Sequence, residues 1–245
     1  MLRLIRNCSH GNEITTFYFE KNQEKNIIKA SSCQIGIEQI KKEVNGWKWY
    51  QSKRYPNSKT HLCNIIKNNK NYIKIKIKYI EGFKEKYSKG IQKNSALIYK
   101  IIEHYCNIWQ GYKENKFPLH GDLSIDNVIT NKDGIHIIDW EYFSLDAAPF
   151  GFDAYNLLFE QLWFSMKERK RPKRSEIDVL LDSIRLIRSS STESHLFLDQ
   201  PLFSVQRFIK TNSRFWKNQI HRLPALLFNG EQIGIIDKMI RLYNT

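Results

Sequence analysis

The chain of 245 residues contains few cysteines and lacks long apolar runs. Its four cysteines are scattered, with no CxxC pair and no metal-ligand spacing, which argues against a disulfide framework or a zinc site. No apolar run reaches the roughly 20 residues that a membrane span needs. The N-terminus also lacks the long apolar core of a signal peptide. We therefore expect a cytoplasmic protein with reduced thiols.

Aspartate is absent from the first 90 residues, so the N-terminal third is strongly basic. It holds 19 lysines and arginines against 7 glutamates, a net charge of +12, whereas residues 91–245 hold 20 basic against 18 acidic residues, a net charge of +2. Such a segment attracts nucleic acids and anionic membranes. Lysine in place of arginine, with many isoleucines and asparagines, is also the usage of an AT-rich genome. We expect no nucleic-acid partner, while peripheral membrane contact through this basic lobe and the oligomeric state stay open.

The N-terminal third has the pattern of a small β-sheet with one helix. Apolar runs between polar turns predict strands at Leu2–Cys8, Ile14–Glu20 and Asn26–Ala30. Residues 35–50 carry apolar side chains at the spacing of a helix. In residues 72–80 isoleucine alternates with lysine, which predicts a strand with one buried and one solvated face.

Beyond Gly82 the pattern becomes mostly helical. A long helix is expected at Ile91–Gln110, and helical periodicity returns from Phe152 to the end of the chain. Between them, Val128–Thr130 and Ile135–Ile138 have the pattern of a hairpin that turns on an Asp-Gly step.

These elements predict an α+β fold with two lobes. Residues 1–82 are expected to form a β-rich lobe with one helix, and residues 83–245 a mostly helical lobe with one hairpin. The change of pattern near residues 80–84 marks the hinge. A chain of this length is sufficient for two small lobes that share a cleft.

Three polar residues of the second lobe have the chemistry that phosphoryl transfer requires. The reaction needs a carboxylate to accept the proton of the attacking hydroxyl, oxygen ligands for Mg²⁺, and a cation on the phosphates. Asp122 and Asn127 lie five residues apart on the loop before the hairpin, in the run HGDLSIDN. The hairpin returns the chain so that Asp139 is expected beside Asn127. We therefore expect Asp122 to be the catalytic base, and Asn127 and Asp139 to bind Mg²⁺.

The loop HGDLSIDNVI resembles the catalytic loop of the aminoglycoside phosphotransferase and choline/ethanolamine kinase superfamily, relatives of the protein kinases. The later segment IDWEYFS…GFDAYNLLFE is more similar to the choline-kinase side. This resemblance implies a protein-kinase-like two-lobed fold and the same roles for Asp122, Asn127 and Asp139. It also implies that Asp153 steadies the catalytic loop. The strong motif covers only residues 117–160.

The same resemblance implies a nucleotide clamp in residues 1–82. Lys29 lies where the superfamily's phosphate-pairing lysine belongs, and its partner would be a glutamate on the following helix. Glu43 lies closer to the apolar stripe of that helix than Glu38 does, so we prefer Glu43. Ile80 in the hinge would offer backbone groups to adenine. The turn at residues 9–12 lacks the GxGxxG of protein kinases, which argues against a protein kinase more than against ATP binding.

The acceptor is the part of the function that the sequence determines least. In the superfamily that the chain resembles, the helical lobe carries the acceptor. Glu141, Glu160, Trp163 and Trp216 are candidates for an acidic, aromatic site that binds an ammonium group. The alternative, that Trp163 and Trp216 are core residues and Glu160 is a helix glutamate with its own partners, is the favoured interpretation of these residues. Candidate acceptors are choline, ethanolamine, thiamine, an aminoglycoside, or a sugar of a polysaccharide or lipid-linked glycan.

We therefore expect an ATP- and Mg²⁺-dependent kinase that moves the γ-phosphate to a hydroxyl of a small molecule or glycan. One alternative is a catalytically inactive kinase-like binding module, against which the presence of Lys29, Asp122, Asn127 and Asp139 argues. Another is a basic protein that binds polyanions or membrane surfaces, which predicts salt-sensitive affinity without nucleotide turnover.

Overall fold

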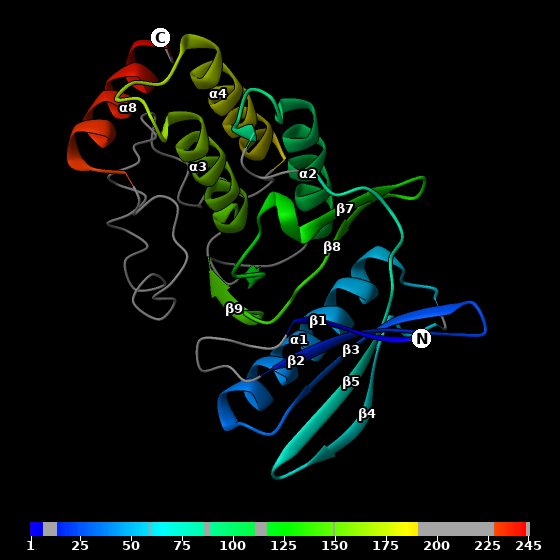
Figure 1. The fold of residues 1–245 in the computed structure, drawn as a ribbon. Coiled ribbons are helices and arrows are strands. Elements are labelled where there is room, and N and C mark those ends of the chain that lie inside the picture. The colour runs from blue at the N-terminus through cyan, green and yellow to red at the C-terminus, as the bar shows by residue number, and fades with distance from the viewer. Residues whose placement is uncertain are drawn as a thin grey trace. The chain divides into compact units, whose positions relative to one another are not determined.

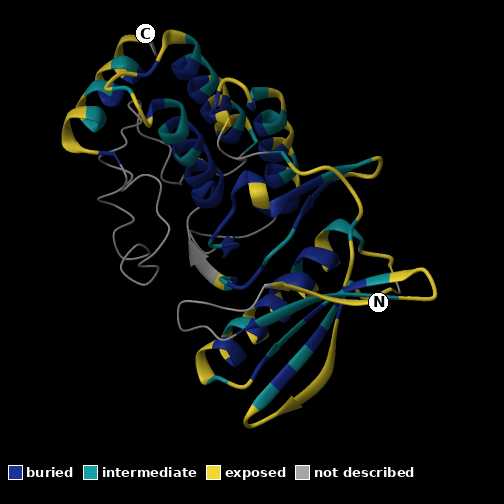
Figure 2. Cartoon of the chain, viewed as in Figure 1, coloured by how far each residue is buried: buried dark blue, intermediate teal, exposed yellow. Residues whose placement is uncertain are grey.

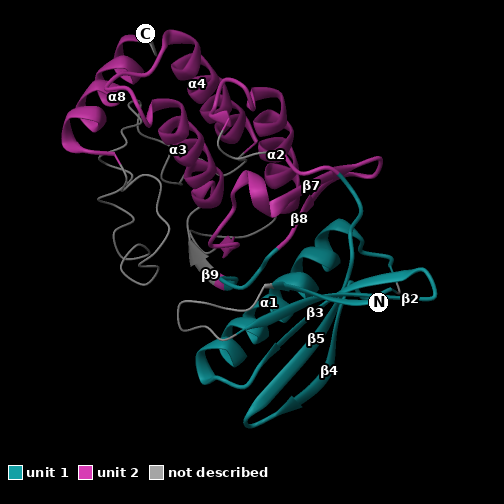
Figure 3. Cartoon of the chain, in the orientation of Figure 1, with its two compact units in different colours: residues 1–82, 139–144 teal, residues 83–138, 145–245 magenta. Residues whose placement is uncertain are grey.

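The computed structural model describes residues 1–6, 14–58, 60–85, 89–110, 117–148, 150–190 and 228–243. The chain divides into two units (Figure 3). Unit 1 consists of Met1–Gly82 and Asp139–Ser144, and unit 2 of Phe83–Ile138 and Leu145–Thr245. The first break follows Gly82, where the sequence pattern changes. Unit 1 also takes in a short segment from the second half of the chain.

Unit 1 is built on one antiparallel sheet of five strands in the order β1-β2-β3-β5-β4 (Figure 1). The strands are β1 (Leu2–Arg6), β2 (Thr15–Lys21), β3 (Glu24–Ser31), β4 (Cys63–Asn69) and β5 (Tyr72–Lys78). The turn expected at residues 9–12 and the last residues of the first expected strand lie outside the described residues. The sequence pattern does not predict the edge strand β4, because CNIIKNN has six exposed residues and no alternation.

Helix α1 (Gln34–Arg54) packs against one face of this sheet. Ile73, Ile75 and Ile77 of β5 are buried on that face, whereas the lysines between and after them are half-buried or exposed (Figure 2). The strand with one buried and one solvated face is therefore confirmed. The helix that the apolar stripe of residues 35–50 predicts is also confirmed, and it continues for one further turn.

Aromatic side chains hold residues 139–144 against α1. Trp140 is fully buried, and its ring centroid lies 5.7 Å from that of Trp49 and 5.1 Å from that of Tyr50. Gly46 of α1 permits this close approach, because a Cβ atom at that position would lie 2.5 Å from the Cβ of Trp140. Packing on α1 therefore explains why this segment belongs to unit 1, although the sequence pattern groups it with the second lobe.

In its described residues, unit 2 is mostly helical and contains two short strand pairs (Figure 1). The described elements are α2 (Ser95–Ile108), β6 (Phe117–Leu119), β7 (Val128–Asn131), β8 (Gly134–Ile137), β9 (Ser144–Ala148), α3 (Phe152–Met166), α4 (Arg174–Ser189) and α8 (Gly230–Tyr243), and only Ser144, the first residue of β9, is assigned to unit 1. Strands β7 and β8 form the expected hairpin. Helix α2 begins later than its apolar pattern suggests. The α+β class is confirmed, and in the described ranges no helix is long and apolar enough to cross a membrane.

Candidate active site

Lys29 is the centre of an ion-pair group in unit 1. It lies opposite Ile75 in the β3–β5 register, so its side chain points to the face that α1 covers. Its Nζ lies 2.9 and 2.8 Å from the two carboxylate oxygens of Glu43 and 2.8 Å from Oδ1 of Asp139. The side chains of Lys29 and Glu43 are only 12% and 1% exposed. A nearly buried ammonium is thus held between two carboxylates.

The preference for Glu43 over Glu38 as the partner of Lys29 is confirmed. Glu43 lies on the side of α1 that packs against the sheet, whereas Glu38 is exposed and accepts a hydrogen bond from Gln34. Helical periodicity was sufficient for this prediction, because only a glutamate near the apolar stripe faces the strand that carries Lys29. The second partner, Asp139, was expected only as a metal ligand.

Burial and the neighbouring charges shift the pKa values of this group. Burial by itself would lower the pKa of the Lys29 ammonium, but the carboxylates of Asp139, Glu43 and Glu141 raise it above its ordinary value. Burial raises the pKa of Glu43 to about 7, because Lys29 offsets only part of the desolvation. Lys29 therefore stays protonated at neutral pH and is a fixed cation, as the binding of nucleotide phosphates requires.

Asp139 has a left-handed backbone conformation, with φ at 65°. A residue with a side chain seldom adopts this region, and such conformations cost about 1–3 kcal/mol where they persist. Here the ion pair with Lys29 and the burial of the next residue, Trp140, hold the backbone in place. Backbone strain of this kind is concentrated at functional sites, which agrees with a functional rather than a purely structural role for the Asp139 carboxylate.

The loop after β6 places Asp122 and Asn127 in contact within unit 2. Both residues are 8% exposed. Asn127 ends the short 3₁₀ turn η2 (Ile125–Asn127), and its Nδ2 donates to the backbone oxygen of Asp122 at 2.8 Å and to Oδ2 of its carboxylate at 3.3 Å. These bonds orient the Asp122 carboxylate. They also leave Oδ1 as the atom that Asn127 can offer to a cation.

His120 links the same loop to the end of β8. Its Nδ1 accepts the backbone N–H of Asp122 at 3.2 Å, and its Nε2 lies 3.0 Å from the carbonyl oxygen of Ile138. Because a carbonyl can only accept, Nε2 carries the proton and the imidazole is neutral. The motif contains His120, but its letters alone assign no role to this residue. The structure shows that it positions the backbone of Asp122.

The β7–β8 hairpin returns the chain to this loop. The N–H of Ile138 donates to the carbonyl oxygen of Asn127 at 2.9 Å, and Asp139 is the next residue in the chain. In the part of the chain that the structure describes, no three His, Cys, Asp or Glu side chains form a cluster that could hold a metal. Mg²⁺ often takes only one or two protein ligands and completes its shell with phosphate oxygens and water. Asn127 and Asp139 each carry an oxygen donor of the kind that Mg²⁺ prefers, and their role as metal ligands stays a prediction.

Asp153 fixes the start of the Asp122 loop, as the resemblance implies. Its two carboxylate oxygens accept the backbone N–H groups of His120 at 2.8 Å and of Gly121 at 2.9 Å. Asp153 lies in the first turn of α3 and is 1% exposed. Two consecutive amides are thus held by one carboxylate on a buried helix. This arrangement restricts the backbone from which Asp122 projects.

Burial raises the pKa of Asp153 from 3.8 to about 7, although the backbone N–H groups of His120 and Gly121 oppose the shift. The folded state therefore keeps a proton that the unfolded chain loses above about pH 4. The stability linked to this proton is complete below about pH 4 and is lost as the pH rises through about 7. We expect the free energy of unfolding of the wild-type chain, relative to that of Asp153→Asn, to fall by up to roughly 4 kcal/mol between about pH 4 and pH 8.

Urea unfolding of both chains across this pH range measures the difference. Asp133→Asn is the matched control, since it removes an exposed carboxylate from the β7–β8 turn of the same unit. The difference in the free energy of unfolding between Asp133→Asn and the wild-type chain should change little with pH. An equally flat difference for Asp153→Asn would contradict the prediction.

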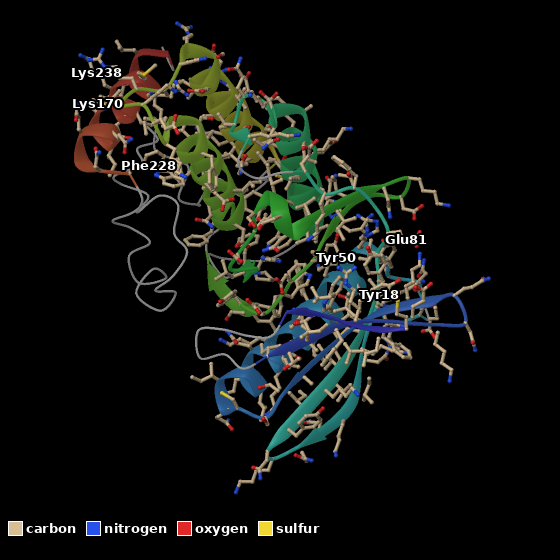
Figure 4. The ribbon with its side chains drawn as sticks, viewed as in Figure 1. Tyr18, Tyr50, Glu81, Lys170, Phe228 and Lys238 are labelled. Carbon is tan, nitrogen blue, oxygen red and sulfur yellow. The ribbon has the colours of Figure 1, made fainter. Side chains whose placement is uncertain are left out.

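The hinge segment after β5 is tied to the sheet of unit 1. The N–H of Tyr79 donates to the carbonyl oxygen of Lys25 at 3.1 Å, and the Lys25 ammonium forms an ion pair with Glu81. The ring of Tyr79 lies edge-on to that of Tyr18, with centroids 5.4 Å apart (Figure 4, in which Tyr18 and Glu81 are labelled). Ile80 is half-buried within this segment. Its role toward adenine stays a prediction.

The residues suggested for the acceptor are distributed over both units. Glu141 is 9% exposed and lies in unit 1, where its charge acts on Lys29. Glu160 is half-buried on α3 in unit 2. Trp163 is half-buried and lies edge-on to the next residue, and Trp216 lies outside the described residues. The structure therefore does not bring Glu141 and Glu160 together within one unit.

Comparisons with known proteins find this fold among solved structures. No protein-family model and no curated protein sequence matches the chain. An amicoumacin kinase solved with AMP-PNP and Ca²⁺ matches with a TM-score of 0.58 and 9% identity, over 99% of this chain and 87% of the kinase. An ethanolamine kinase of Plasmodium vivax matches with a TM-score of 0.52 and 11% identity, over 98% of this chain and 81% of the kinase. The chain shares the fold of these small-molecule kinases, which confirms the resemblance at the level of the fold.

Proposed function

We propose that the chain is an ATP- and Mg²⁺-dependent phosphotransferase that moves the γ-phosphate to a hydroxyl of a small molecule. The observation that carries this proposal is the ion-pair group of Lys29, Glu43 and Asp139. A stable fold has no need of a buried ammonium between two carboxylates, one of them on a strained backbone, because burying charges costs more than apolar packing. Phosphoryl transfer does need a fixed cation and a nearby metal-binding carboxylate.

Lys29 and the hinge have the nucleotide-binding roles in this proposal. The Lys29 ammonium pairs with the phosphates, and Glu43 holds the ammonium in place from α1. The backbone of the hinge segment around Ile80 offers hydrogen bonds to adenine. The nucleotide analogue in the amicoumacin kinase structure supports a nucleotide site in this fold.

Asp139 and Asn127 are the proposed ligands of Mg²⁺. Both are hard oxygen donors, and the amide of Asn127 is oriented by the bonds of its nitrogen to Asp122. When bound, Mg²⁺ neutralises the charge of the phosphates and orients them. In the free protein Lys29 neutralises Asp139, so the same carboxylate has a partner before the metal arrives.

Asp122 is the proposed catalytic base. Its carboxylate orients the acceptor hydroxyl and accepts its proton as the oxygen–phosphorus bond forms and ADP leaves. His120 and Asn127 hold the backbone and the carboxylate of this residue, and Asp153 holds the start of the loop. Contacts with three residues thus hold the proposed base and its loop in place before any substrate binds, as an effective base requires.

For the acceptor we favour a hydroxyl compound that carries an ammonium group. The half-buried carboxylate of Glu160 on α3, the helix that also carries Asp153, offers a negative charge for such a cation. An ethanolamine kinase shares the fold. A sugar of a glycan remains the second class to be tested.

Thermal unfolding of the purified chain with ATP and GTP, each with and without Mg²⁺, tests the proposal. At a nucleotide concentration of 100 times Kd the expected stabilisation is about 2.7 kcal/mol, or a rise in Tm of roughly 5–10 °C. The rise should require both nucleotide and metal. Amino alcohols, aminoglycosides and sugars are then screened for the release of ADP. No shift with any nucleotide near millimolar concentration would contradict the proposal and favour an inactive kinase-like binding module.

A further inference from the structure

The sheet of unit 1 has a second face, opposite to α1, which we call the outer face. In an antiparallel sheet, residues directly opposite each other point to the same side. Lys74, Lys76 and Lys78 of β5 point to the outer face, because the isoleucines between them are buried on the inner one. The register of the sheet then decides which residues of the other four strands share this face.

The outer face carries a strong excess of positive charge. Among the strand residues that the structure describes, the register puts five lysines and one acidic side chain on it: Lys21, Lys67, Lys74, Lys76, Lys78 and Glu24. The net charge of this face is therefore five minus one, or +4. The single acid, Glu24, lies 3.3 Å from Lys76, so it can neutralise only one of the five lysines.

Some lysines of the outer face lie close enough to one another for their like charges to repel. Lys67 of β4 lies directly opposite Lys74 of β5, and Lys76 follows on the same side roughly 7 Å along the strand. Like charges in directly opposite positions destabilise a sheet. A flat partner with many negative charges would relieve this repulsion at several lysines at once, whereas one acidic side chain would relieve it at one.

Exposed apolar side chains lie on the same face beside the lysines. Leu2 and Leu4 of β1 are 64% and 51% exposed. They lie opposite Phe19 and Phe17 of β2, which are half-buried, so these side chains share the outer face. These apolar side chains thus lie on β1 and β2, whereas four of the five lysines lie on β4 and β5. This combination suits the boundary of an anionic bilayer, where apolar side chains enter the acyl region and lysines meet the phosphates.

We propose that the outer face of the unit 1 sheet docks on an anionic lipid bilayer. The proposal goes beyond the phosphotransferase function and does not depend on it. A nucleic acid would use the lysines but would leave Leu2 and Leu4 in water, and the face carries lysine rather than the arginine that is suited to bidentate phosphate contacts. A bilayer uses both parts of the face.

Co-sedimentation of the full chain with vesicles tests this proposal. We expect binding to phosphatidylcholine vesicles that contain phosphatidylglycerol, weaker binding at high salt, and none to phosphatidylcholine alone. Each lysine at an anionic surface contributes about fivefold in affinity, so K74Q/K76Q/K78Q should bind roughly a hundredfold more weakly. The matched control K41Q/K42Q/K48Q removes the same charge from exposed positions of α1 and should bind nearly as the wild-type chain does.

A second variant separates lipid from other polyanions. L2S/L4S keeps every lysine but removes the exposed leucines, so it should weaken vesicle binding and leave the binding of heparin and duplex DNA unchanged. Each variant is checked for its Tm, so that a folding defect is recognised. Equal losses in the two triple lysine variants would overturn the proposal. So would vesicle binding that the leucine substitutions do not affect, which would point to a nucleic acid or another soluble polyanion.

Discussion

We expect the replacement of Asp122 by alanine to lower kcat by about 10²–10⁴-fold, because the acceptor hydroxyl would lose the group proposed to orient it and to accept its proton. We expect the affinity for the nucleotide to change little. The ion-pair group at Lys29 does not include Asp122, and the shorter bond of Asn127, to the backbone oxygen of residue 122, does not depend on the side chain there. The measurement is the release of ADP with the best acceptor found in the screen, together with nucleotide binding followed by calorimetry. A fall in kcat without a matching change in nucleotide Kd identifies a residue that acts in the transition state.

Asp126 provides the matched control for this prediction. Asp126→Ala removes a carboxylate from the same loop, but this one is exposed and accepts a hydrogen bond from Ser124. We expect turnover close to that of the wild-type chain. If Asp122→Ala turns over at the wild-type rate, Asp122 is not the base. Equal losses of activity in the two variants would show that the substitutions disturb the loop. A catalytic role of Asp122 would then not be distinguished from a structural one.

We expect the replacement of Asp139 by asparagine to remove the metal-dependent part of nucleotide binding. Asparagine tolerates the left-handed backbone at this position and keeps an oxygen that can accept from Lys29, so the fold should survive. It lacks the negative charge that attracts Mg²⁺. We expect the affinity for ATP in the presence of Mg²⁺ to fall on the order of a hundredfold, the equivalent of about 3 kcal/mol.

Calorimetric titration of ATP with and without Mg²⁺ measures this effect. Asp133→Asn, in the exposed turn between β7 and β8, serves as the control and should bind as the wild-type chain does. Affinity unchanged in Asp139→Asn would remove Asp139 from the metal site. The two variants are distinguishable. Asp122→Ala should lose turnover but keep its affinity for the nucleotide, whereas Asp139→Asn should lose affinity for the nucleotide.

Local patterns in the sequence were sufficient to predict several elements of the fold and one contact of the candidate site. The Asp-Gly step predicted the β7–β8 hairpin, and the alternation of isoleucine and lysine predicted the two faces of β5. The apolar stripe of α1 was sufficient to choose Glu43 as the partner of Lys29. The hairpin depends on residues that are close together in the chain. The two faces of β5 and the choice of Glu43 depend on which side of one element is buried, and the spacing of the apolar residues indicates that side.

Contacts between distant segments were decided only by the tertiary structure. The ion pair of Lys29 with Asp139 joins residues 110 positions apart, and no pattern within either segment encodes it. The strand β4 is an exposed edge, so its sequence carries no alternation. The assignment of residues 139–144 to unit 1 depends on the space that Gly46 leaves for Trp140. Periodicity shows which face of an element is buried, but only three-dimensional packing decides which distant segment covers it.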